Sequence, residues 1–319
     1  MASVETFEIL APGILTTVQD RGRFGYGRYG VPPSGALDSF SLRMGNLLVG
    51  NPEDEAALEI TLMGPKIKVL TEVVVAITGA DLQPCLNDEP MEMWRSYVLK
   101  KDDILSFKGI KSGCRSYLAI GGGISIPIVM GSKSTNLPSK FGGFGGRALQ
   151  KGDILASNSP HLYLTKGGRK LSQEFVPAYG KEWAFRVVFG PQDEQFTEDA
   201  KETFISSPYQ VTPQADRTGI RLAGPVIERK PEVSESIISE GVVPGAIQVP
   251  GDGQPIILLV ETVTGGYRKI ATVITADLHL LGQLKPGDTL RFKEVSLDEA
   301  YKALIESEAR IRRFKESLE

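Results

Sequence analysis

The stretch Gln19-Asp20-Arg21-Gly22-Arg23-Phe24-Gly25, followed by Gly30-Val31-Pro32-Pro33-Ser34-Gly35-Ala36-Leu37-Asp38, decides how the first part of the chain is interpreted. It combines charges, glycines and two prolines without any hydrophobic period, so it is neither a helix nor an ordinary strand. Glycine lets the backbone approach a ligand closely, and proline stiffens a turn. We interpret the stretch as a rigid loop that offers polar atoms to a ligand. The alternative is a tight surface connection with solvated charges.

Short strands surround this loop. Apolar segments at 7–10 and 13–18 precede it, and Asp38 is a suitable N-cap for a short helix over about 39–48. Further apolar segments between glycine, proline and asparagine turns predict strands at 56–62, 67–70, 73–78, 104–108, 115–120, 185–189, 237–238, 256–260, 270–274 and 289–293. The sequence therefore predicts a mainly β chain, with a second short helix over 196–205.

The end of the chain and its internal repetition suggest the domain organisation. Ser296-Leu297-Asp298-Glu299 is a capping box, and apolar residues follow at helical spacing, so we expect a terminal helix over 297–317. Leu62-Met63-Gly64-Pro65 resembles Leu222-Ala223-Gly224-Pro225, and similar lysine–aspartate turns recur in the same order. This repetition favours two related β-rich domains, although such turns also recur by chance.

Composition excludes several classes of function. The chain has 319 residues and a formal net charge of -3, without a lysine/arginine block, which argues against nucleic acid as a partner. Its apolar runs are too short to span a bilayer. Two cysteines form no disulfide framework for a chain of this size, so a cytoplasmic location is expected. Only two histidines are present, so we predict no histidine-based metal site and no Ser-His-Asp triad.

Two similar charged turns are candidates for binding an anion. Asp216-Arg217-Thr218-Gly219-Ile220-Arg221 echoes Asp20-Arg21-Gly22-Arg23, because each combines a carboxylate with two guanidinium groups beside a glycine. The planar guanidinium fork suits bidentate binding of a carboxylate or phosphate. A structural ion pair at the end of a strand is the alternative, and the sequence leaves both open.

Three glycine-rich segments offer further contacts. Gly131-Ser132-Lys133-Ser134-Thr135 is not a Walker A motif, but its amides and Lys133 are suited to holding an anion. The segment 142–147 either closes over a ligand, with Arg147 as a contact, or is a disordered glycine loop. Thr264-Gly265-Gly266-Tyr267 places a hydroxyl, two amides and an aromatic ring together. That combination suits a small polar ligand, and a twisted hairpin with Tyr267 packed on it is the alternative.

Taken together, these motifs resemble the biotin-dependent carboxyltransferase domain, or allophanate hydrolase subunit 2, family. Its members include the C subunit of bacterial ATP-dependent 5-oxoprolinase and the protein that antagonises the sporulation-kinase inhibitor. Matching segments run in order from residue 16 to about 267: 16–23, 30–38, 46–51, 58–59, 79–81, 117–123, 130–135, 190–192, 216–221, 247–253 and 264–267.

The resemblance implies two cyclophilin-like β-barrel domains, at 1–182 and 183–319, the second including the C-terminal helix. It also implies two partner proteins. One is a B subunit related to allophanate hydrolase subunit 1, and the other is an A subunit. Such a complex opens the lactam of 5-oxo-L-proline to L-glutamate, coupled to ATP hydrolysis, so ATP is expected through the complex.

Two other functions remain open. One is the carboxyltransferase half of a biotin-dependent enzyme that acts on urea or a related amide, with biotin as its cofactor. This chain carries neither a biotin-attachment motif nor an ATP-grasp signature, so both would lie elsewhere. The other is a non-catalytic regulator that binds a kinase-inhibitor protein. The small size of the chain suits the 5-oxoprolinase component better.

The expected site gathers side chains from both halves of the chain into one anion-binding hollow. Asp20, Asp38 and Asp252 are the candidates for a catalytic base or orienting group, and none of them ranks first. The candidate substrate- or anion-binding residues are Arg21, Arg23, Ser34, Lys133, Arg147, Arg217, Gln248, Thr264, Gly265, Gly266 and Tyr267. The chain departs from the family pattern at Val260, Thr262 and Arg268, where aspartate, glutamine and proline are usual.

Overall fold

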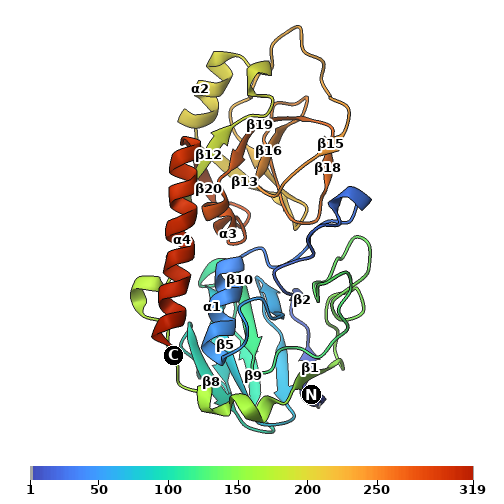
Figure 1. Cartoon of the computed structure of the whole chain (residues 1–319), viewed down its shortest axis with the longest axis vertical. Helices are drawn as coiled ribbons and strands as arrows, with labels where there is room; N and C mark the ends of the chain where they lie inside the picture. The colour runs from blue at the N-terminus through green and yellow to red at the C-terminus, as the bar shows by residue number, and fades with distance from the viewer. Residues whose placement is uncertain (1–2, 319) are drawn as a thin grey trace. The chain divides into compact units, whose positions relative to one another are not determined.

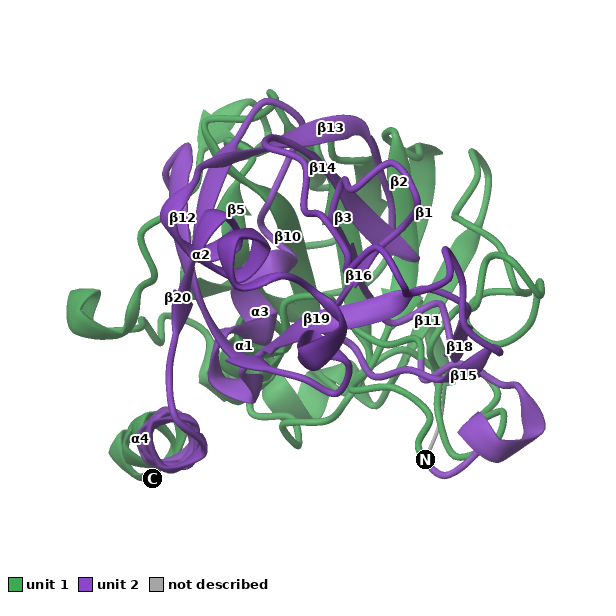
Figure 2. Ribbon diagram, turned by 90° about the horizontal axis from the view of Figure 1, so that it is seen from above, with its two compact units in different colours: residues 1–24, 34–179, 310–319 green, residues 25–33, 180–309 purple. Residues whose placement is uncertain are grey.

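The computed structural model describes residues 3–318, and its contacts divide the chain into two compact units (Figure 2). Unit 1 comprises residues 1–24, 34–179 and 310–319, and unit 2 comprises residues 25–33 and 180–309. These units are defined by contacts and not by independent folding. The domain boundary at 182/183 therefore stays a prediction.

Unit 1 is built from two sheets. The order in one sheet is β11-β1-β4-β9-β6-β7, and the order in the other is β2-β3-β10-β5-β8. The strands are β1 (Ser3–Ala11), β2 (Leu15–Gln19), β3 (Ala57–Thr61), β4 (Lys66–Val69), β5 (Val73–Asp81), β6 (Pro84–Leu86), β7 (Glu89–Pro90), β8 (Arg95–Leu99), β9 (Ile104–Phe107), β10 (Ser112–Ile120) and β11 (Ile154–Asn158).

Apolar residues of both sheets form the core of unit 1. Phe7 and Ile67 of one sheet and Leu58, Ile77 and Leu118 of the other belong to one fully buried cluster. Burial of this kind contributes roughly 25 cal/mol per Å² of apolar surface. Buried residues alternate with more exposed ones along both β4 and β11, but only the strand at β4 was predicted from the sequence.

Helix α1 (Ser39–Val49) covers the other face of the second sheet, over β5 and β10 (Figure 1). Asp38 caps it by accepting a hydrogen bond from the Ser41 amide, so the predicted cap and helix are confirmed. Gly45 allows the close approach, because a Cβ there would lie 3.0 Å from Thr78 Oγ1. Unit 1 also holds the 3-10 helices Pro160–Lys166 and Gln173–Phe175.

Unit 2 contains a closed barrel in the order β12-β19-β16-β17-β14-β13-β20. Its strands are antiparallel except for β12 and β20, which pair in parallel. The strands are β12 (Glu182–Phe189), β13 (Tyr209–Ala215), β14 (Gly219–Ala223), β16 (Ala246–Val249), β17 (Ile256–Leu258), β19 (Arg268–Val273) and β20 (Thr289–Glu294). β15 (Glu240–Gly241) and β18 (Thr264–Gly265) form a separate ribbon.

The remaining helices are α2 (Glu198–Ser206), α3 (Leu278–Leu281) and α4 (Leu297–Ser317), with 3-10 turns at Gly27–Tyr29, Asp193–Gln195 and Thr275–Asp277. The Ser296 hydroxyl and amide both donate to the Glu299 carboxylate, and the Glu299 amide returns a bond to Ser296 Oγ. This is the predicted capping box, so α4 begins and ends as expected. In the described range, none of the helices is long and apolar enough to cross a membrane.

The prediction of a mainly β fold with barrel architecture and a C-terminal helix is confirmed. The strand predicted at 237–238 is wrong, because these residues lie in an irregular segment of unit 2. The prediction also missed several strands of unit 2. β13 and β14 alternate apolar with polar or charged residues, and β13 contains Pro213, so neither shows a continuous apolar run.

Candidate functional site

The register of β2 against β3 assembles a cluster at one end of the second sheet of unit 1. Gln19 pairs with Ala57, so Asp20, just after β2, lies beside the residues that precede β3. The segment 132–135 joins them from far along the chain, because the Thr135 amide donates to the Val18 carbonyl. Three segments thus meet at one sheet edge.

Asp20 is the centre of this cluster. Its carboxylate accepts hydrogen bonds from Ser134 Oγ at 2.5 Å, the Lys133 amide at 2.6 Å and Ser132 Oγ at 2.7 Å. A fourth bond comes from the Gly22 amide at 2.8 Å. The side chain is buried, and its charge is stabilised by these donors. Asp20 therefore ties the loop at 20–22 to the segment 132–134.

Lys133 is held by an acidic residue that the sequence analysis missed. Its Nζ lies 2.6 Å from Glu55 Oε1, and both side chains are partly buried. Gly123 makes room for Glu55, since a Cβ at this position would lie 2.4 Å from the Glu55 carboxyl carbon. Its φ of +68° also disfavours other residues. The glycine triplet after β10 therefore sets the place of the Glu55–Lys133 pair.

A cavity of about 600 Å³ opens over this cluster. Arg21 and Asp54 line it, are exposed, and make no hydrogen bond or ion pair with the described residues. The Gly131 backbone faces open space on the same wall. Residues lining this arginine cavity are Asp20, Arg21, Gly22, Phe24, Pro52, Asp54, Glu55, Ala56, Ile128, Gly131 and Lys133.

Three carboxylates and two cations line the cavity, and Lys133 is paired with Glu55, so the capacity of the cavity to bind an anion rests on Arg21. Arg21 offers a guanidinium fork for a carboxylate or phosphate, and the exposed Phe24 and Ile128 offer apolar surface. Asp54 adds an acceptor for a donor group of the ligand. Asp20 keeps the loop rigid, since its own oxygens are occupied.

Arg23 and Ser34 lie beneath the loop surface. Arg23 is 1% exposed, donates to the carbonyls of Val129 and Ser134, and lies over the Phe141 ring at 4.6 Å. Ser34 is buried and accepts a hydrogen bond from Asn136 Nδ2 at 3.1 Å. Both residues hold the loop walls in place.

Asp38 belongs to a buried polar network. It accepts bonds from the Ser41 hydroxyl at 2.6 Å and from the Tyr179 hydroxyl at 3.2 Å, and its amide donates to the Tyr117 hydroxyl. Tyr117 in turn donates to Glu59. Burial, followed by the charges of Glu59 and Asp38, raises the pKa of Tyr117 well above its ordinary value. Tyr117 therefore remains a donor at every physiological pH.

Arg147 forms an ion pair with Asp153, six residues later in the chain. It makes two bonds to the Asp153 carboxylate, at 2.7 and 2.8 Å, and lies over the Phe144 ring. The hydrogen bond to Asp153 raises the pKa of Arg147, and the same bond lowers the pKa of Asp153. The glycine loop before it is ordered by this pair, and the guanidinium already has an anionic partner.

In unit 2, Arg217 forms a buried ion pair. Its Nη2 lies 3.0 Å from Glu261 Oε1, and the side chains of Arg217 and Glu261 are 5% and 1% exposed. Asp216 instead accepts bonds from the amides of Thr218 and Gly219. Arg217 therefore forms a structural ion pair, which was the alternative to binding a ligand. Its partner is Glu261 and not the neighbouring Asp216.

A second polar cluster surrounds the Thr-Gly-Gly-Tyr turn. Gln248 is buried and donates through Nε2 to the Tyr267 carbonyl at 3.1 Å. A Cβ at Gly265 would lie 2.1 Å from that Nε2, so only glycine fits. Thr264 and Gly265 form β18, whereas the Gly266 carbonyl accepts a bond from the Ile237 amide. Tyr267 is 39% exposed.

The sequence analysis missed the charged part of this cluster. Lys269 is buried, and its Nζ contacts Glu240 Oε1. Gln192 Nε2 donates to the same oxygen at 2.7 Å. The bonds from Lys269 and then from Gln192 lower the pKa of Glu240. The signal available in the sequence was a lysine directly before the apolar run at 270–274. Asp252 lies apart from this set in an exposed turn, where it accepts a bond from the Gln254 amide.

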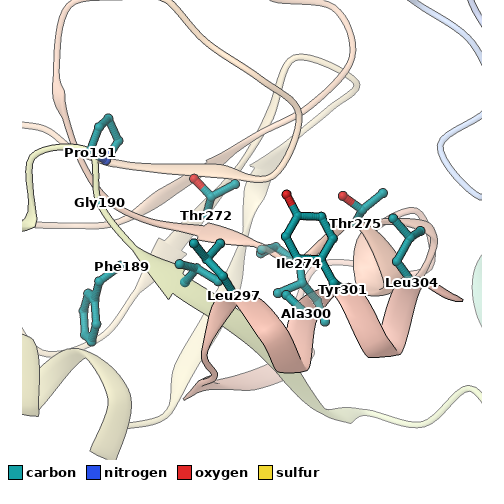
Figure 3. Close-up of a pocket in the computed structure, with 12 residues that line it drawn as sticks. Phe189, Gly190, Pro191, Thr272, Ile274, Thr275, Leu297, Ala300, Tyr301 and Leu304 are labelled. Carbon is teal, nitrogen blue, oxygen red and sulfur yellow. The ribbon is translucent and has the colours of Figure 1, made fainter. Parts of the chain in front are cut away.

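Unit 2 contains an apolar cavity of about 480 Å³ (Figure 3). The first turns of α4 and the strands β12 and β19 line it, with Leu297, Tyr301 and Ile274 pointing toward it. None of its lining residues is an acid, a lysine or an arginine. Its chemistry differs from that of the arginine cavity.

The structure therefore places the predicted residues in several environments. It brings Asp20, Arg21 and Lys133 together in unit 1, and Gln248, Thr264, Gly265, Gly266 and Tyr267 together in unit 2. Arg23, Ser34, Asp38, Arg147 and Arg217 lie in buried networks or ion pairs of their own. That both groups form one anion-binding hollow stays a prediction.

Comparison with known proteins identifies the family. The family described as carboxyltransferase domain, subdomain A and B, matches residues 29–294. The chain belongs to this family. The predicted resemblance is thereby confirmed.

Relatives of this carboxyltransferase-domain protein fall into two groups. It is 38% identical over 302 residues to the 5-oxoprolinase C subunit of Escherichia coli (strain K12), covering 93% of each chain. It is also 38% identical over 312 residues to urea amidolyase of Lachancea kluyveri, where the match covers 91% of this chain but 17% of that protein. The crystal structure of the K. lactis urea amidolyase matches with a TM-score of 0.91 at 35% identity, over 98% of this chain and 20% of the other.

These relatives are an enzyme subunit and large enzymes of which the chain spans a fifth or less. They support a role in an enzyme system at the level of the family. They also indicate a protein that works with other subunits or domains. The particular reaction, cofactor and partners are proposals.

Proposed function

We propose that the chain acts as the C subunit of an ATP-dependent 5-oxoprolinase, which hydrolyses 5-oxo-L-proline to L-glutamate together with B-like and A-like partner proteins. The observation that carries this proposal is the 38% identity to the Escherichia coli protein across 93% of both chains. We further propose a cytoplasmic location, which suits the two buried free thiols Cys85 and Cys114.

The arginine cavity supports this substrate. 5-Oxo-L-proline carries one carboxylate and one lactam amide on a compact apolar ring, whereas urea carries no charge. Arg21 would bind the carboxylate, because its guanidinium is exposed and has no partner in the described structure. Phe24 and Ile128 would contact the ring. Lys133 would neutralise Glu55 beside the site, since its ammonium is paired with that carboxylate.

Other residues would support these contacts. Asp20 would act as an orienting group, since four donors occupy its oxygens. The Gly131 amide, at the wall of the arginine cavity, would stabilise developing oxyanion charge, where the loss of one such donor typically costs roughly 3 kcal/mol in the barrier. Asp54, the exposed acid of the cavity, is a better candidate for a base than the capping residue Asp38.

The segment Gly131–Thr135 does not fit a nucleotide phosphate as a Walker loop does. The Lys133 amide donates to Asp20, and its ammonium pairs with Glu55, so neither is free to cradle a phosphate. ATP would therefore be bound by the complex and not by this segment.

The direct experiment reconstitutes the purified chain with its B-like and A-like partners. We expect glutamate release that requires both ATP and 5-oxo-L-proline. Absence of glutamate from an intact complex, whose assembly is checked by size-exclusion chromatography, would overturn the proposal. A non-catalytic regulator predicts that outcome.

A carboxyltransferase acting on urea or a related amide is the second candidate, favoured by the TM-score of 0.91 against urea amidolyase. In that case Arg21 would bind the carboxyl group that biotin delivers. Carboxylation of urea in the presence of a carboxybiotin donor, without glutamate release from 5-oxo-L-proline, would establish this alternative.

A further inference from the structure

Arg268, the first residue of β19, is a buried cation whose hydrogen-bond partners are all neutral. Its side chain donates to Gln195 Oε1, to the Ser234 carbonyl and to Ser234 Oγ. The residue is 5% exposed, and no carboxylate pairs with it among the described residues. A guanidinium in such a position is costly unless an anion compensates its charge.

A second arginine increases this imbalance. Burial, and then the positive charge of Arg229, lowers the pKa of Arg268. Arg229 is half-buried, and its side chain makes no hydrogen bond or ion pair in the described part of the chain. The adjacent Lys230 likewise has no ion-pair partner there. Three cations of unit 2 thus lie near one another without an ion pair to a carboxylate.

A small polar cavity opens beside these residues. It has a volume of about 250 Å³, and Arg229, Lys230 and Glu228 are its charged lining residues. Gly251 and Gly253 also line it, and a Cβ at Gly253 would lie 2.4 Å from Val226. The cavity thus combines two neighbouring cations with a glycine wall against which Val226 packs closely.

The charges around this cavity select the ligand. In the lining, Arg229 and Lys230 outnumber the one carboxylate, Glu228. The carboxylate of Glu235 lies against Gly251 of the lining, and Arg268, which is close enough to Arg229 to be affected by its charge, adds a third cation. The site therefore keeps an excess of positive charge. A phosphate group offers three strong acceptor oxygens and nearly two negative charges at neutral pH, so it can contact both lining cations at once.

We propose that Arg229 and Lys230 bind a phosphate group in this cavity of unit 2. Arg268 is a positioning residue, which holds the loop at Ser234 and adds positive potential behind the ligand. The site is distinct from the arginine cavity of unit 1, and it does not depend on the proposed 5-oxoprolinase activity.

The test uses the full chain and inorganic phosphate as the probe. We expect sodium phosphate to raise the Tm by roughly 3 °C at about ten times its Kd, relative to sodium chloride of equal ionic strength. Isothermal titration should show the same binding. Sodium glutamate is the comparison ligand that carries carboxylates. An equal rise in the Tm with glutamate would overturn the assignment to phosphate.

Variants distinguish a phosphate site from the alternative that Arg268 only holds the loop at Ser234 in place. Arg229→Gln should weaken phosphate binding by at least about 10-fold without lowering the Tm in chloride, since the side chain makes no bonds and its charge opposes that of Arg268. The matched control is Arg221→Gln, an exposed arginine at another cavity of unit 2, which should retain phosphate binding. Arg268→Gln should lower both the Tm in chloride and the phosphate-dependent increment.

If Arg268 only holds the loop in place, the variants should change the Tm in a different pattern. Arg268→Gln would then lower the Tm equally in both salts, and Arg229→Gln would change nothing. Either that pattern, or a wild-type chain whose Tm is the same in phosphate and chloride, would overturn the proposal.

Discussion

The turns at Asp20 and Asp216 share a local design but place their arginines in opposite ways. Each aspartate accepts a bond from the amide two residues later, at 2.8 Å from Gly22 and 2.7 Å from Thr218. In unit 1 the first arginine, Arg21, is exposed and the second is buried. In unit 2 the first, Arg217, is buried and the second is exposed.

This difference shows what a charged turn does and does not specify. The aspartate and its following amides define the turn locally. Residues distant in sequence decide which guanidinium stays accessible to a ligand. Glu261 forms an ion pair with Arg217, whereas Arg23 donates hydrogen bonds to the carbonyls of Val129 and Ser134. Of the four arginines in these two turns, Arg21 is the one that is exposed at a cavity that also holds a lysine.

The largest expected effect comes from breaking the buried pair of unit 2. Arg217→Ala leaves Glu261 buried without its partner, so we expect a loss of about 3–5 kcal/mol in the free energy of unfolding. Urea denaturation followed by circular dichroism measures it. Arg221→Ala in the same turn is the control and should change stability by less than about 0.5 kcal/mol. Similar losses in both variants would contradict the contrast drawn between the two arginines.

The aspartates should differ as well. Asp20→Ala removes the acceptor of four hydrogen bonds and leaves buried donors unsatisfied, so we expect a loss of about 2–4 kcal/mol. Asp216 is exposed and accepts two amide bonds, so Asp216→Ala should cost about 0.5–1 kcal/mol. The same denaturation series compares them, and equal costs would remove Asp20 from its role as the organiser of the cluster.

The exposed arginines provide the functional contrast. Arg21→Ala should lower kcat/KM of the reconstituted 5-oxoprolinase by roughly 100-fold, about 2.7 kcal/mol, because the substrate carboxylate loses its charged partner. Arg221→Ala should retain activity, and neither change should affect stability by more than about 0.5 kcal/mol. Full activity of a folded Arg21→Ala complex would remove the proposed anion contact.

The sequence predicted those features that depend on neighbouring residues. Asp38 and the capping box at 296–299 fixed the starts of α1 and α4, because a cap and its helix lie within four residues. The strands that were missed have mixed patterns, as in β13, where exposed polar residues and Pro213 interrupt the apolar ones. Their place in the barrel depends on partners elsewhere in unit 2.

The candidate site was predictable only in part for the same reason. Asp20, Arg21 and Lys133 were among the candidate residues and lie in one loop cluster, yet nothing local indicates that Lys133 meets Glu55. The acidic residues just before β3 look like a solvated turn in the sequence. Only the register of β2 with β3 brings Asp54 and Glu55 to the cavity.

The smallest expected effect concerns the turn that Arg147 closes. Its hydrogen bond to Asp153 lowers the pKa of that carboxyl, so the pair stabilises the fold above the unfolded-state pKa of about 3.9. The stabilisation is lost as the pH falls through the lower folded-state pKa. Because the Arg147 side chain is 38% exposed, solvent screens the pair, and we expect Asp153→Asn to cost less than about 1 kcal/mol at pH 7. Urea unfolding at pH 7 and near pH 3 should show this difference shrinking at the acidic end. A difference that persists there would mean that Asp153 acts through its shape and its bond from the Gln150 amide. The charge that binds Arg147 would then contribute nothing to stability, although both of its bonds to Asp153 would remain in the fold.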